Sequence, residues 1–120
     1  MKVIKVDAAC YPFSILVITT KKIKKLEKFL KKEKVTIGDQ GRANALTIDI
    51  GNGKMVIWLK GKVETLEQLS VLNHEIFHVV CFILQDLAIK LDENSEEAYA
   101  YLTDYVSLRI YKKLGIKISY

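Results

Sequence analysis

Hydrophobic positions in this chain form four short runs and three longer stretches with helical period. The runs at 3–6 and 15–19 are short, and the second is rich in β-branched residues, so both predict strands. The runs at 45–50 and 54–60 flank Gly51-Asn52-Gly53, whose residues tolerate a positive φ, and they predict a hairpin. The second arm of that hairpin is the most hydrophobic strand in the chain.

A lysine-dense helix is predicted over residues 20–34. Ile23, Leu26 and Leu30 fall at i, i+3 and i+7, which gives one apolar stripe among the lysines. Much of the net charge of +5 sits on this helix, and we expect it to pack on one face and to be solvated elsewhere. Only Phe29 is interleaved with the lysines, and Lys lacks the bidentate fork of Arg, so we expect no nucleic-acid partner.

A second helix is predicted over residues 65–91. Thr65 and Gln68 have the spacing of a capping box at its start. From residue 69 to residue 87 the stretch is apolar on nearly every face, which is typical of a central buried helix.

The motif His74-Glu75-Ile76-Phe77-His78 interrupts this apolar helix and contains both histidines of the chain. Two imidazoles four residues apart lie on one helix face and can bind one zinc ion, with Glu75 beside the metal as general base. Burying such polar side chains costs free energy unless a metal or strong hydrogen-bond partners compensate. The motif therefore predicts a zinc site, and a pair of hydrogen-bonded structural histidines is the alternative.

A third helix is predicted over residues 96–114, with Gly115 as its stop. A catalytic zinc usually has three protein ligands, and no third histidine exists here, so a carboxylate or thiol must complete the site. Glu96 and Glu97 open this helix and are the candidate carboxylates. Asn94-x-x-Glu97 is also a capping box, so helix capping is the alternative role of Glu97.

The segment from about residue 71 to residue 106 resembles the gluzincin class of zinc metallopeptidases, in which H-E-x-x-H is followed by a glutamate ligand on a downstream helix. His74-Glu75-x-x-His78-Val79 followed by Ser95-Glu96-Glu97-Ala98-Tyr99-Ala100-Tyr101-Leu102 is similar to small phage-encoded proteins described as zinc peptidases. The resemblance implies that Zn2+ is held by His74, His78 and Glu97, with Glu96 as the second choice for the third ligand. It also implies a peptide or protein substrate bound along a sheet edge, for which we expect the strand at 54–60.

We therefore predict an α+β fold for residues 1–120: one minimal zincin-like domain with a small mixed sheet, the lysine helix, the active-site helix and the glutamate helix. The predicted function is zinc-dependent hydrolysis of peptide bonds by an activated water, with Glu75 as the catalytic base. The alternative is a zinc-stabilised interaction protein, of phage origin, without proteolytic activity. It is favoured by the small size of the chain and by the lack of a downstream histidine that could stabilise the oxyanion.

Composition changes this picture little. The chain has 120 residues, of which 50% are hydrophobic and 28% charged, as in an ordinary globular domain. Cys10 and Cys81 are too few for a disulfide framework. No apolar run approaches ~18 residues, so we expect no membrane span and a cytoplasmic protein, and the oligomeric state stays open.

Overall fold

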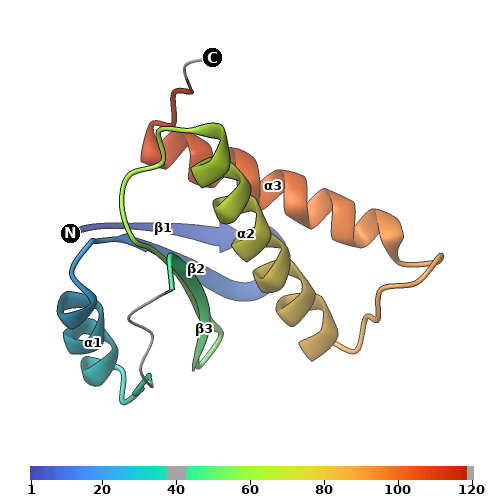
Figure 1. Ribbon diagram of the computed structural model, residues 1–120. Helices are drawn as coiled ribbons and strands as arrows, with labels where there is room; N and C mark the ends of the chain where they lie inside the picture. The colour runs from blue at the N-terminus through green and yellow to red at the C-terminus, as the bar shows by residue number, and fades with distance from the viewer. Residues whose placement is uncertain (38–42, 119–120) are drawn as a thin grey trace.

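The structure is a computed structural model that describes residues 1–37 and 43–118 (Figure 1). In chain order, the elements of the described part are β1 (Lys2–Ala8), β2 (Tyr11–Thr19), α1 (Ile23–Lys32), β3 (Ala45–Gly51), β4 (Lys54–Leu59), α2 (Leu66–Asp86) and α3 (Glu96–Leu114). This arrangement confirms the predicted α+β fold with a small mixed sheet and three helices in the described residues.

The four strands form one sheet in the order β1-β2-β4-β3. The hairpins β1–β2 and β3–β4 are antiparallel, and β2 and β4 run parallel to each other, with Ile15 opposite Met55. The prediction that residues 54–60 form the edge strand is wrong, because β4 lies inside the sheet and β3 is the edge. All five residues of β4 after Lys54 are buried, and such a run of apolar residues fits a central strand that is covered on both faces.

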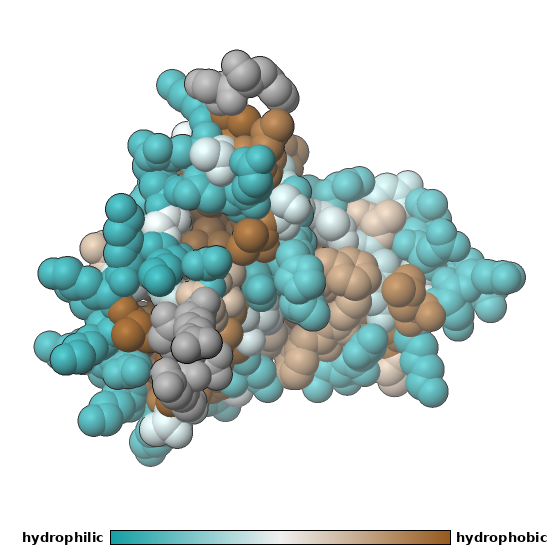
Figure 2. Space-filling view, viewed as in Figure 1, coloured by the Kyte–Doolittle hydropathy of each residue, from teal (hydrophilic) through white to brown (hydrophobic). Residues whose placement is uncertain are grey.

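Helices cover both faces of the sheet, α1 on one and α2 with α3 on the other (Figure 1). Alternate residues of β4 divide between these two cores. Met55 and Ile57 pack in the larger core with α2 and α3, whereas Val56 and Trp58 pack in the smaller core with Leu26 of α1. The lysine stretch therefore packs through its apolar stripe, as predicted, and Figure 2 shows a largely hydrophilic surface at the α1 end.

The start of α2 and the end of α3 follow the capping signals of the sequence. Thr65 and Gln68 form the predicted capping box of α2. This helix ends at Asp86 rather than near residue 91, because Ala88 adopts a positive φ of 63° and turns the chain out of the helix. Gly115 ends α3 in the left-handed conformation, as predicted.

Helix α2 is buried on one side only, which corrects the prediction of a helix buried all round. Leu72, Ile76 and Val80 pack in the larger core, while Phe77 is 47% exposed. The physical reason is that α2 lies on the sheet beside α3, and no further layer of the described residues covers its outer side (Figure 1). In the described part of the chain, no helix combines the length and the apolar character that a membrane span needs.

Candidate active site

The two histidines of α2 face each other across one helical turn. Nε2 of His74 lies 3.0 Å from Nε2 of His78, and the two ring planes are inclined by 81°. Zinc held tetrahedrally by nitrogens at about 2.0–2.1 Å separates two ligand atoms by about 3.3 Å, so a small movement would fit this pair to one ion. Both side chains are exposed, so their placement costs little desolvation, contrary to the expectation from the apolar stretch around them.

Glu75 is turned toward the sheet, unlike the two histidines beside it. Its side chain is buried, with 8% of its surface exposed. The Thr47 hydroxyl, on edge strand β3, donates a hydrogen bond to Oε2 of Glu75 and also lies 3.2 Å from the Glu75 carbonyl oxygen. A buried carboxylate needs such a donor, and this contact therefore fixes Glu75 between α2 and the edge of the sheet.

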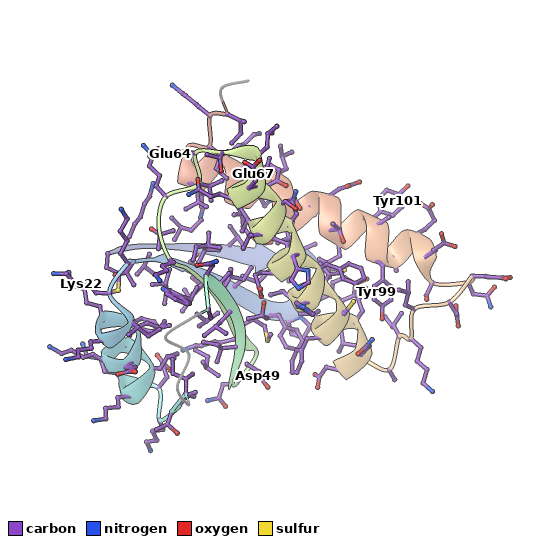
Figure 3. The ribbon with its side chains drawn as sticks, viewed as in Figure 1. Lys22, Asp49, Glu64, Glu67, Tyr99 and Tyr101 are labelled. Carbon is purple, nitrogen blue, oxygen red and sulfur yellow. The ribbon has the colours of Figure 1, made fainter. Side chains whose placement is uncertain are left out.

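A groove of about 510 Å³ runs between β3 and α2. Its lining residues are Ala45, Leu46, Thr47 and Asp49 of β3, Met55 of β4, and Glu75, His78 and Phe82 of α2. Figure 3 labels Asp49 on the strand side of this region. The groove lies beside the edge strand β3, whereas the prediction put the cleft beneath the strand at 54–60. Phe82 packs edge-on against Phe13 of β2, with ring centroids 6.4 Å apart, so this side of the groove is apolar.

A second cavity, of about 470 Å³, lies at the start of α2 and contains no residue of the histidine motif. Its lining includes Lys21, Lys60 and Lys62 together with Glu64 and Glu67, two of the residues labelled in Figure 3. Charges of both signs meet there, so the lining favours neither an anion nor a cation. Glu75 and His78 of the motif line the groove along β3 instead, and His74 is not among its lining residues.

Glu97 is not brought together with the histidines. Among the residues that the structure describes, no group of three or more His, Cys, Asp or Glu side chains could hold a metal ion. Glu97 is exposed in the first turn of α3, which begins beyond the end of α2 (Figure 1). The alternative role as a capping box with Asn94 is also not realised, because Ser95 is the N-cap and its side chain makes no capping hydrogen bond.

No tyrosine of α3 is among the residues that line the groove. Three of them use their hydroxyl groups elsewhere: Tyr99 donates to the Ile89 carbonyl, Tyr105 to Asp7 and Tyr111 to Asn73. Tyr101 is 71% exposed and points away from α2 in Figure 3. The groove therefore receives no phenol from α3 that would stabilise a developing negative charge on a substrate.

Thr47 is the site residue that sequence reasoning missed. Its partner lies 28 residues away, and nothing in the local pattern of β3 marks a threonine as different from its neighbours. Strand alternation was the one available signal, because it places Thr47 on the same face as Ala45, toward α2. Alternation alone could not identify Glu75 as the partner, because that also requires knowing where α2 lies on the sheet.

No protein-family model, curated protein or solved structure matches this chain. The functional conclusion therefore depends on the local geometry alone. That geometry consists of a facing histidine pair, a buried carboxylate one residue away from it, and a groove along an edge strand.

Proposed function

We propose that this protein is a zinc-dependent metallopeptidase of zincin-like architecture. The observation that carries the proposal is the pair of Nε2 atoms of His74 and His78, 3.0 Å apart, with Glu75 adjacent in a groove beneath the edge strand. Imidazole nitrogens suit zinc well, and an acidic residue next to a metal-binding histidine can act as a general base. The same 3.0 Å separation also fits a hydrogen bond between two neutral imidazoles, which is the structural alternative that metal analysis must exclude.

The third metal ligand is assigned to Glu97, with Glu96 as the second choice. Both carboxylates are exposed in the first turn of α3, so neither is committed to the core. They lie apart from the histidine pair, and the first turn of α3 must approach α2 in the zinc-bound protein. The connection formed by residues 87–95 would have to accommodate that approach.

The reaction divides between the metal and the residues of the groove. When bound, zinc supplies a Lewis acid that acidifies water and polarises the carbonyl group of a peptide. Glu75 removes the proton of the attacking water and passes it to the leaving amine. The edge strand β3 offers backbone donors and acceptors to an extended peptide, as in β-augmentation. Met55 and Phe82 line the groove and favour an apolar side chain of the substrate.

The alternative is an interaction protein that binds zinc without proteolysis. It is favoured by the two-histidine set of the described residues and by the lack of an α3 tyrosine in the groove. Figure 2 shows hydrophobic surface over the second half of α2, where Phe77 is exposed and Phe82 is half-buried, and such surface also suits a protein partner.

The test combines metal analysis with peptide cleavage. Zinc per chain is measured on the wild type, Glu97→Ala and Glu96→Ala, with Glu93→Ala as a matched control from the neighbouring loop. The proposal expects nearly one zinc in the wild type and the control, and loss of zinc in Glu97→Ala. Glu75→Gln should keep zinc but lose cleavage of a diverse peptide library. Zinc-loaded wild type that cleaves nothing would leave the interaction protein, and a chain that binds no zinc would overturn both readings.

A further inference from the structure

Thr47 makes the one polar contact between the edge strand and the Glu75 side chain among the described residues. It is half-buried in the middle of β3, and its Oγ1 lies within hydrogen-bonding distance of both Oε2 and the carbonyl oxygen of Glu75. A hydroxyl has one proton, so it donates to one of these oxygens at a time. The carboxylate is the stronger acceptor, because charge-assisted hydrogen bonds are roughly twice as strong as neutral ones.

We propose that Thr47 is a positioning residue for Glu75: it holds Oε2, so that the other carboxylate oxygen is left to accept the proton of the attacking water. This inference rests on the proposed peptidase function. Glu75 reaches the groove through three rotatable bonds, and its backbone on α2 does not fix the carboxylate alone. A displacement of about 1 Å at a reacting group can cost on the order of 10²-fold in rate, so a residue that limits this freedom affects turnover directly.

A threonine is chemically suited to a base that changes its protonation state. While Glu75 is ionised, the Thr47 hydroxyl donates to Oε2. After Glu75 has taken a proton, the same hydroxyl can turn and accept a hydrogen bond from the carboxylic acid. Lys or Arg could only donate, and either would hold Glu75 in its charged form. Thr47 therefore keeps one contact through both halves of the proton transfer.

The first test compares Thr47→Val, which keeps the shape and removes the hydroxyl, with Thr47→Ser, which keeps the hydroxyl. Thr103→Val is the matched control, because Thr103 is also half-buried and donates to a backbone carbonyl, but on α3 and outside the groove. We expect kcat of Thr47→Val to fall by about 10-fold or more with KM within about 2-fold. Thr47→Ser should recover most of kcat, Thr103→Val should match the wild type, and zinc content should be equal in all.

The second test needs no activity. Thr47→Val should lower Tm by about 4 °C in the wild type, because it leaves the buried carboxylate without its donor, and by much less in a Glu75→Met background. If Thr47→Val does not fold, Thr47→Ala replaces it in both tests.

The outcomes separate this inference from the proposed function. If the wild type is active and Thr47→Val retains full kcat, the inference is wrong and the peptidase stands. If Thr47→Val and Glu75→Met act additively on Tm, Thr47 does not hold Glu75, and the inference is wrong whatever the activity. If they are coupled but the zinc-loaded wild type cleaves nothing, the peptidase proposal fails, and the catalytic part of the inference fails with it.

Discussion

Zinc should stabilise the folded protein, and His78→Ala should abolish that stabilisation. A ligand that binds only the folded state adds about 2.7 kcal/mol to the free energy of unfolding at a hundred times its dissociation constant. For a domain of 120 residues, 1 kcal/mol corresponds to roughly 4 °C, so the wild type should gain about 10 °C in Tm. The Nε2 pair at 3.0 Å predicts that removing either imidazole removes most of this gain.

Because His78 is exposed, its truncation should affect the zinc-induced shift in Tm without much effect on the stability of the zinc-free protein. Truncating an exposed side chain changes stability by less than about 0.5 kcal/mol, so the zinc-free His78→Ala protein should melt within roughly 2 °C of the wild type. Ser70→Ala, exposed on α2 about two turns before His78, is the control and should keep the full zinc shift. The assay is thermal unfolding over a zinc titration after treatment with a chelator. A wild type whose Tm does not respond to zinc, or a His78→Ala protein with an equal shift, would refute the metal site.

Three further predictions concern the fold that holds the site. The hydrogen bond that Tyr105 donates lowers the pKa of Asp7 in the folded protein below its unfolded value. The ionised Asp7 carboxylate therefore stabilises the fold above about pH 4, and this stabilisation is lost as the pH falls through the lowered pKa of the folded state. Tm measured against pH should therefore decline less steeply in acid for Asp7→Asn, and parallel curves would count against the contact. Trp58→Phe leaves a buried carbonyl without its indole donor and should cost about 1–3 kcal/mol in urea unfolding, whereas an unchanged midpoint would contradict that role. Gly53→Ala should destabilise more than Gly51→Ala: both have positive φ, but a Cβ at 53 would lie 2.7 Å from a backbone oxygen and one at 51 would meet nothing within 4 Å. Equal losses of unfolding free energy in Gly53→Ala and Gly51→Ala would contradict the role of this close contact.

The sequence predicted the elements well where a local signal defines them. The capping box at Thr65 and the stop at Gly115 both depend on neighbouring residues, and the structure has them where they were expected. The strand at 54–60 was misplaced because its apolar character was interpreted without its neighbours. A run of apolar residues indicates burial on both faces, and which strands provide that burial is decided by pairing across the sheet.

The candidate site divides in the same way. His74 and His78 could be paired from their spacing alone, because one helical turn determines their separation. The partner of Glu75 could not be found, since Thr47 reaches it only after β3 and α2 pack together. The position of Glu97 relative to the histidines could not be predicted from the sequence either. It depends on the path of residues 87–95, where the positive φ of Ala88 ends α2 earlier than expected, while α3 still begins at Glu96.

The histidine pair is a local feature of one helix, whereas the contact of Glu75 with Thr47 joins residues that are far apart in the chain. Both imidazoles belong to one turn of α2, so a nascent helix already presents two metal-binding nitrogens before any tertiary structure exists. The contact with Thr47 requires the β3–β4 hairpin to join β2 through the parallel ladder, and such non-local pairing forms more slowly. In the proposed peptidase, zinc binding to the histidine pair would therefore not require an aligned base, and a partly folded chain that holds zinc would be unable to cleave itself or its neighbours.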